Sequence, residues 1–206
     1  MNGPRIALIF DYDGVLADTE PLHWKSWAKL LLSYGIEFTW EEYRAYGQGV
    51  DDVQFCKSIP TKWPHLDANE LLERNVERKQ SVCEMSLAVP PIPQEIVALL
   101  TTLRAYRLGL VTSSERSSVE PVLRACNILD KFDALVFGEE VARRKPSPEP
   151  YLLIKQRLAI NTGIAFEDST PGAESALAAG LKVVRVESPH HLAQILASPL
   201  IPMTAK

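Results

Sequence analysis

Short apolar runs alternate with amphipathic segments along most of the chain. The runs are "IALIF" (6–10), "LGLV" (108–111), "ALVF" (134–137), "GIAF" (163–166) and "KVVRV" (182–186). They are continuous rather than alternating, which is typical of strands buried on both faces of a parallel sheet. The segments between them have helical spacing, although the segment 117–129 can be a helix only if Pro121 lies in its first turn. This order predicts an α/β fold with a Rossmann-like parallel sheet.

The region of residues 18–85 contains no strand-like run, but several helix signatures. One is the pair Thr39 and Glu42, which predicts a capping box at a helix N-terminus. We therefore expect a core domain of residues 1–17 and 86–206, with a small helical cap domain of residues 18–85 inserted after the first strand. Such an insertion would act as a lid over the carboxyl end of that strand, where open α/β sheets bind ligands.

Composition and charge exclude several classes of protein. The 206 residues carry a formal net charge of -4, with 46% hydrophobic and 23% charged residues, as in an ordinary globular protein. The chain contains no run of basic residues with interleaved aromatics, which would indicate a nucleic-acid partner. The three cysteines lack the spacing of a zinc site or a disulfide framework. The first apolar run is too short to span a membrane and lacks signal-peptide features, so we expect a cytoplasmic protein without a membrane partner. The oligomeric state is left open, and a monomer is plausible.

Polar side chains follow four of the predicted strands at the point where each strand ends. They are Asp11 and Asp13, then Thr112, Ser113 and Ser114, then Lys145, and finally Glu167 and Asp168. Alone, the acids and hydroxyls are typical of a turn or a helix cap, and a lysine before a proline is typical of a solvated side chain. Because the carboxyl ends of parallel strands meet at one edge of the sheet, we expect them to converge on one crevice. Such a cluster of acids requires a cation.

The converging side chains suit phosphoryl transfer through an aspartyl-phosphate. Asp11 would attack phosphorus, while Lys145 and Thr112 would hold the phosphoryl oxygens whose charge grows in the transition state. Asp13 would protonate the leaving alkoxide and later take a proton from the attacking water. The paired acids at the end of the first strand would thus divide the roles of nucleophile and proton shuttle.

Mg²⁺ is the expected cofactor, because a carboxylate can attack a dianionic phosphate only if the charge is neutralised. Its predicted ligands are Asp11, Asp168 and the backbone carbonyl of Asp13, with Glu167 close by through water. A calcium loop of the EF-hand type is excluded, because Gly14 stands at the fourth position of "DYDG" instead of the sixth.

Four segments resemble the motifs of the haloacid dehalogenase superfamily. They are "FDYDGVLADTE", "LVTSSE", "RRKPSPEPY" and "FEDSTPG", which occur in the same order over roughly residues 5–186. The chain is most similar to the β-phosphoglucomutase-like phosphatases of that superfamily. The resemblance implies a Rossmann-like core, a four-helix cap, a requirement for Mg²⁺ and the roles given above for the core residues. It also places Thr19 and His23 in the cap hinge of that group, as substrate-binding residues.

The reaction predicted from these residues is hydrolysis of a small phosphate monoester. Retention of Asp13 disfavours cleavage of a carbon–halogen bond. A hexose phosphate mutase of the β-phosphoglucomutase type is the alternative, but Asp52 stands where such mutases carry an arginine, with Lys79 and Arg116 as partial compensation. A phosphate- or metal-binding module without turnover is a third reading. The substrate, a sugar or polyol phosphate, is expected to contact Ser113, His23, Thr19, Gly49, Asp52, Lys79 and Arg116.

Overall fold

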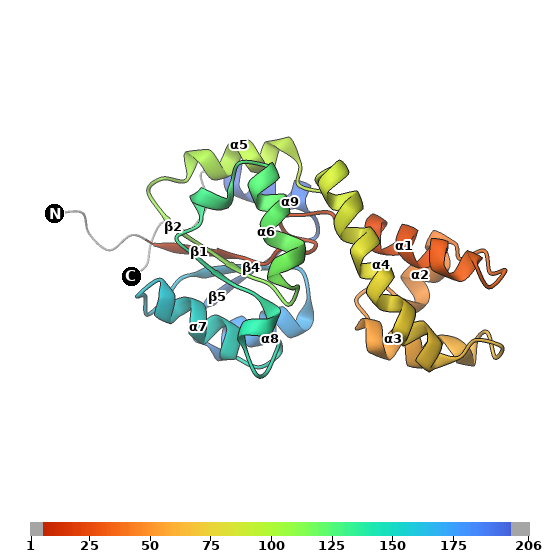
Figure 1. The fold of residues 1–206 in the computed structure, drawn as a ribbon. Coiled ribbons are helices and arrows are strands. Elements are labelled where there is room, and N and C mark those ends of the chain that lie inside the picture. Colours follow the sequence, from red (N-terminus) through yellow and green to blue (C-terminus); the bar gives the residue numbers. More distant parts are fainter. Residues whose placement is uncertain (1–5, 199–206) are drawn as a thin grey trace. The chain divides into compact units, whose positions relative to one another are not determined.

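The protein folds into two compact units (Figure 1). The computed structural model describes residues 6–198. One unit, the core, comprises the chain up to Asp18 together with Pro90 onward, and the other, the helical unit, is Thr19–Val89. The predicted boundary after residue 85 falls inside a helix, α4 (Ala68–Ala88). No helix-breaking residue occurs before Pro90, so the helix continues to Ala88, and Val89, the residue before the proline, is extended.

The core contains a parallel five-stranded sheet, and this confirms the predicted fold class. Its strands are β1 (Ala7–Phe10), β2 (Arg107–Val111), β3 (Ala134–Val136), β4 (Ile164–Glu167) and β5 (Lys182–Arg185). Their order in the sheet is β3-β2-β1-β4-β5, so the direction of strand succession reverses between β1 and β4. In the shared register, Ile9 pairs with Gly109 on one side and with Ala165 on the other. The reversal is the point at which open α/β sheets bind ligands.

Helices cover both faces of the sheet, which explains why the strands read as continuous apolar runs. Leu8 and Phe10 face one side, and Ala7 and Ile9 face the other. The first side is covered by α5 (Gln94–Thr102), α6 (Arg116–Ala125) and α9 (Pro189–Ala197), and the second by α7 (Glu149–Arg157) and α8 (Thr170–Ala178) (Figure 1). The alternate side chains of one strand therefore enter two separate apolar layers.

Helix α6 departs from the prediction at Pro121. The helix begins at Arg116, so Pro121 lies inside it instead of in its first turn. That expectation was wrong. A proline at this position has no N–H to donate to the carbonyl four residues earlier. The helix nevertheless buries Val119, Val122 and Leu123 against the sheet, and the burial of this apolar face offsets the missing hydrogen bond.

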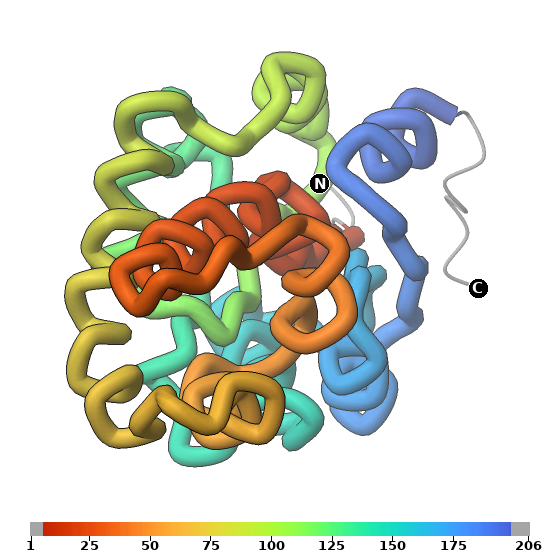
Figure 2. The backbone as a smooth tube through the Cα atoms, turned by 90° about the vertical axis from the view of Figure 1, so that its right-hand side faces the viewer, coloured from red at the N-terminus to blue at the C-terminus, as the bar shows by residue number. Residues whose placement is uncertain are grey.

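The helical unit has an apolar core of its own. It contains α1 (Glu20–Leu32), α2 (Trp40–Tyr46), α3 (Asp52–Ser58) and α4, which packs against α1 and α3 (Figure 2). The predicted capping box is present at α2, where Glu42 N donates to the Thr39 side chain and Thr39 N donates to the Glu42 carboxylate. Short 3₁₀ helices occur at Ile59–Thr61 in this unit and at Leu129–Lys131 and Gly138–Glu140 in the core. None of the helices described is both long and apolar enough to cross a membrane.

The two chain segments that lead into and out of the helical unit are joined within the core. The backbone N–H of Asp18 donates to the carbonyl of Pro91 at 2.9 Å. The chain therefore leaves the core and returns to it at one place.

Candidate active site

The candidate active site lies where the sheet order reverses. Asp11 directly follows β1, and its backbone N–H donates to the carbonyl of Phe166 in β4 at 3.0 Å. Thr112 follows β2 in the same way, and its N–H donates to the carbonyl of Val136 in β3 at 3.0 Å. The ladder thus continues past the strand ends and fixes the backbone that carries both side chains.

Lys145 forms a buried ion pair with Asp11. Its Nζ lies 2.7 Å from Asp11 Oδ1, 2.6 Å from Glu167 Oε1 and 3.1 Å from the carbonyl oxygen of Val111. The side chains of Lys145 and Asp11 are only 7% and 9% exposed. An ammonium has three N–H donors, and these three acceptors match them in number. The lysine therefore joins the end of β1 to the end of β4.

Besides Lys145, two hydroxyl groups of the core donate to the Glu167 carboxylate, and a glycine packs against it. The Glu167 side chain is completely buried, and its Oε1 accepts from the Tyr151 hydroxyl of α7 at 2.5 Å. Ser169 Oγ, in the loop before α8, lies 3.3 Å from Oε2. A Cβ at Gly172, in the first turn of α8, would lie 2.0 Å from the same oxygen. The sequence analysis missed the roles of Tyr151 and Gly172, although both lie within the motifs it singled out.

Asp168 approaches the loop after β1 so closely that a glycine is required there. Gly14 has φ +73°, and a Cβ on it would lie 2.2 Å from Asp168 Oδ2. The guanidinium of Arg185 donates to the backbone carbonyls of Asp168 and Ser169 and so holds the loop that follows β4. Carboxylate oxygens of Asp11, Glu167 and Asp168 all lie within 4.8 Å of one another. This is a donor set of the kind that Mg²⁺ prefers.

Burial, together with the crowding of like charges, shifts the pKa values of this cluster. Burial raises the pKa of Asp11 well above its ordinary value; Lys145 opposes this rise, whereas Glu167 and Asp13 add to it. Burial, followed by the charge of Glu167, raises the pKa of Asp168 to about 6. Burial opposes the charge on Lys145, yet Asp11 and Glu167 outweigh it and raise its pKa. One lysine therefore compensates the acids only in part, and a further cation would lower the electrostatic cost.

Asp13 is oriented by the loop that follows β2. Its Oδ2 accepts from Ser114 Oγ at 2.8 Å. The Ser114 backbone N–H donates to Thr112 Oγ1 at 2.9 Å, and Thr112 is 2% exposed. Ser113 lies between them and is exposed. The structure thus brings the predicted residues Asp13 and Thr112 together through Ser114, a residue that was expected at this strand end but had been given no role.

Five of the predicted substrate-binding residues belong to the helical unit, namely Thr19, His23, Gly49, Asp52 and Lys79. Asp52 Oδ2 forms an ion pair with Arg78 at 2.6 Å and lies 3.9 Å from Lys79 Nζ. Arg78 is 3% exposed, and His23 Nδ1 lies 3.5 Å from its Nη1. Asp52, which the sequence analysis places at the arginine position of the mutases, is therefore bound to an arginine of its own helical unit.

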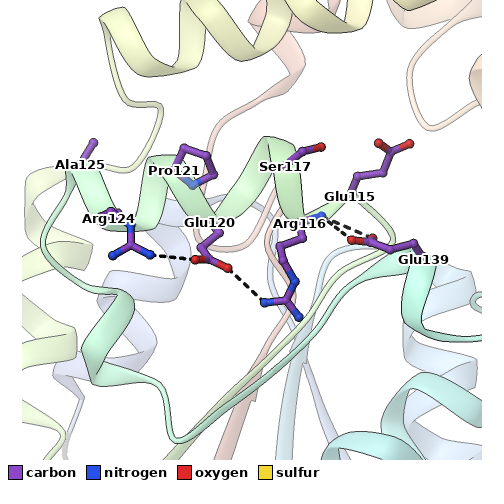
Figure 3. A pocket seen from close by; sticks show the side chains of 8 residues that line it. All are labelled: Glu115, Arg116, Ser117, Glu120, Pro121, Arg124, Ala125 and Glu139. Carbon is purple, nitrogen blue, oxygen red and sulfur yellow. Dashed lines mark hydrogen bonds and ion pairs between the residues drawn. The ribbon is translucent and has the colours of Figure 1, made fainter.

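Arg116 lies beside a hollow of about 790 Å³ along α6, which Glu139 also lines (Figure 3). Its guanidinium pairs with Glu120 at 3.0 Å and with Glu140 at 3.1 Å, and Glu120 also pairs with Arg124 at 2.8 Å. None of the four predicted catalytic residues lines this hollow. The structure thus places Arg116 in a surface ion-pair network and not in the cluster around Asp11.

Curated relatives share nearly the whole chain. They include "Phosphorylated carbohydrates phosphatase" of Thermotoga maritima, 34% identical over 85% of this chain and 82% of the relative. "Hexitol phosphatase B" of Escherichia coli is 31% identical over 100% and 98% of the two chains. "Fructose-1-phosphate phosphatase YqaB" of Escherichia coli is 31% identical over 87% and 95%. These relatives confirm the predicted enzyme class, a phosphatase.

A solved structure and a family model agree with these relatives. A putative β-phosphoglucomutase from Thermotoga maritima superposes with a TM-score of 0.72 and 28% identity over 93% of this chain and 98% of that one. A structure from Geobacter sulfurreducens, described as a HAD-superfamily hydrolase, has a TM-score of 0.74 at 21% identity, covers 93% and 95% of the two chains, and supports the fold alone. Residues 8–186 match the model of the family described as "Haloacid dehalogenase-like hydrolase". The chain belongs to this family, in its β-phosphoglucomutase-like branch, as the four motifs predicted.

Proposed function

We propose that this protein is a Mg²⁺-dependent phosphatase that hydrolyses small sugar or polyol phosphate monoesters through an aspartyl-phosphate. The observation that carries the proposal is the Asp11 carboxylate, held 2.7 Å from Lys145 Nζ at the point where the sheet order reverses. A buried carboxylate fixed in this way is oriented for attack on one bound group. The phosphatase names of the relatives support the same reaction.

The acids of the site fit a magnesium ion. Asp11 and Asp168 would hold it together with the backbone carbonyl of Asp13, and Glu167 would lie behind them. The support is that carboxylate oxygens of three of these residues lie within 4.8 Å of one another, and that burial and mutual repulsion raise the pKa of Asp11 and of Asp168. When bound, Mg²⁺ would neutralise charge on the phosphate and on the acids that face it.

In the first step, a carboxylate oxygen of Asp11 attacks phosphorus, and the bond from phosphorus to the ester oxygen breaks. Asp13 gives a proton to the departing alkoxide. Lys145 and the hydroxyl of Thr112 stabilise the charge on the equatorial phosphoryl oxygens. The products of this step are the alcohol and an acyl phosphate on Asp11.

In the second step, water attacks the phosphorus of the acyl phosphate. Asp13, now ionised, removes a proton from that water, and the bond between phosphorus and the Asp11 oxygen breaks. Inorganic phosphate leaves and Asp11 is restored as a carboxylate. The hydrogen bond of 2.8 Å from Ser114 Oγ fixes one oxygen of Asp13, which keeps the carboxylate in one orientation for both proton transfers.

Hydrolysis is favoured over the mutase reaction because of Asp52. A mutase must bind a bisphosphate and needs a free cation for the second phosphate. In the helical unit, Asp52 binds Arg78, whose side chain is 1% exposed, and lies 3.9 Å from Lys79. Both nearby cations are thus partly neutralised by this aspartate. The names of two relatives, a hexitol phosphatase and a fructose-1-phosphate phosphatase, favour polyol and sugar phosphates as substrates.

The test is phosphate release from hexitol phosphates, fructose 1-phosphate and β-glucose 1-phosphate, with Mg²⁺ and with a chelator. Asp11→Asn removes the nucleophile at nearly constant volume. Asp130→Asn is the matched control, because Asp130 is an exposed acid of the core, 73% exposed, that pairs only with the neighbouring Lys131 among the contacts described.

We expect release that requires Mg²⁺ and is lost in Asp11→Asn but kept in Asp130→Asn. Trapping of ³²P on the wild-type protein, released by mild base, would report the acyl phosphate. Full activity of Asp11→Asn would contradict the proposed nucleophile. Isomerisation of β-glucose 1-phosphate without net phosphate release would favour the mutase.

A further inference from the structure

We propose that Tyr151 is a positioning residue, whose hydroxyl acts through Glu167 to fix the Lys145 ammonium against Asp11. The inference rests on the proposed function for its effect on turnover, but its structural part is testable without any substrate. It assigns a role to a side chain of α7, which lies outside the set of residues expected to touch substrate or metal.

The contacts form a chain of three links. The Tyr151 hydroxyl donates to Glu167 Oε1 at 2.5 Å, the same oxygen lies 2.6 Å from Lys145 Nζ, and Lys145 Nζ donates to Asp11 Oδ1 at 2.7 Å. Both Tyr151 and Glu167 are completely buried, and Lys145 is 7% exposed. In this dry environment no water can replace the phenol as a donor to the carboxylate.

The hydroxyl is not needed for packing. The Tyr151 ring lies in the apolar layer formed by α7 and α8 on one face of the sheet, beside residues such as Ile154 and Val111. A phenylalanine would fill this layer equally well. The hydroxyl, however, faces a carboxylate in the interior, and the hydrogen bonds described for it lead to Glu167 alone.

The phenol limits the rotation of Glu167. Without it, the described partners of the carboxylate would be Lys145 on Oε1 and Ser169, at 3.3 Å, on Oε2. The orientation of Oε1 towards the ammonium would then be less firmly fixed. Gly172 leaves space beside Glu167 Oε2. A Cβ at position 172 would lie 2.0 Å from that oxygen, so any other residue would occupy this space. With the phenol in place, Oε1 is fixed, so the lysine has a single position from which it can contact both Asp11 and a phosphoryl oxygen.

The decisive experiment compares Tyr151→Phe with the wild type, with Tyr46→Phe as the matched control. Tyr46 lies in the helical unit and is 46% exposed, so its hydroxyl is not part of the core. The first readout is the ¹⁵N-edited signal of the Lys145 ammonium in the metal-free, substrate-free protein, assigned with Lys145→Arg. The second is the division of the effect between kcat and KM, together with rescue by 4-aminophenylalanine at position 151, which restores an N–H donor.

We expect Tyr151→Phe to lose or broaden the ammonium signal and to lower kcat about 10- to 100-fold with KM nearly unchanged, the range typical of a partner behind a catalytic group. The amino analogue should recover both, and Tyr46→Phe should change neither. An ammonium signal that is unchanged in Tyr151→Phe would overturn the inference. If the wild type hydrolyses phosphate esters, a kcat of Tyr151→Phe equal to that of the wild type would overturn it as well. If the wild type hydrolyses none, the proposed function fails, and the ammonium signal still decides whether Tyr151 positions Lys145.

Discussion

Replacing Lys145 by Met should destabilise the core far more than removal of a surface charge. The ammonium contacts two carboxylates, Asp11 at 2.7 Å and Glu167 at 2.6 Å, which are 9% and 0% exposed. Methionine keeps much of the apolar stem but leaves two buried acids without their cation. Breaking a buried ion pair by removing one partner costs about 3–5 kcal/mol. The second carboxylate places the expected loss in the upper part of that range.

The distribution of tryptophan allows the loss to be located. All four tryptophans, Trp24, Trp27, Trp40 and Trp63, belong to the helical unit. Tryptophan fluorescence in urea therefore follows the unfolding of that unit, while far-ultraviolet circular dichroism follows both units. Lys145→Met should shift the part of the dichroism transition that fluorescence does not report. The control is Lys131→Met, which removes one partner of an exposed pair worth about 0–1 kcal/mol.

The same variant has an expected pH dependence. Without Lys145, Asp11, whose pKa burial already raises, can stay buried beside Glu167 only if it takes up a proton, which is easier at low pH. The difference in the free energy of unfolding between wild type and Lys145→Met should thus be smaller at about pH 5 than at about pH 8. Equal losses for Lys145→Met and Lys131→Met, at both pH values, would refute the reasoning that this lysine compensates buried charge.

Two further predictions concern the same cluster. Gly172→Ala should lower the free energy of unfolding by about 1–3 kcal/mol, measured in urea, because the new Cβ would lie 2.0 Å from the buried Glu167 carboxylate; an unchanged midpoint would contradict this close approach. The folded-state pKa of Asp168, about 6, lies above its ordinary value of 3.8, so its contribution to stability is present below about pH 4 and is lost as the pH rises through 6. Stabilisation of the protein by Mg²⁺, measured as a shift in Tm, should therefore be larger above pH 6 than below it, and a larger shift on the acid side would argue against Asp168 as a ligand.

The sheet was predictable because its signal is local. Each strand is a short apolar run that ends at polar residues. Because both faces of the sheet are buried, these runs are continuous and lack the apolar–polar alternation of a strand with one exposed face. Pro121 shows the limit of such reasoning. The rule that proline belongs to the first turn is a local preference, and the burial of Val122 and Leu123 on the sheet, which depends on the whole fold, outweighs it.

The grouping of side chains at the candidate site was predictable as far as the polar residues directly follow strand ends. Asp11, Thr112 and Asp168 are of this kind, since the strand order alone brings them together. Tyr151 and Gly172 lie on helices, and their roles depend on which carboxylate they meet in space. The ion pair between Asp52 and Arg78 joins two helices of the helical unit, and no spacing along the chain indicates it.

The hydrogen bond between Asp18 and Pro91 makes the helical unit an exchangeable module. Because the chain leaves the core and rejoins it at one place, the length of the insertion places no mechanical demand on the sheet, and the entropy of closing a longer or shorter loop changes only slowly with its length. An insertion of a different length can therefore join the core at the same place. In protein engineering, the junction between residues 18 and 91 is therefore the place at which another helical unit can be inserted.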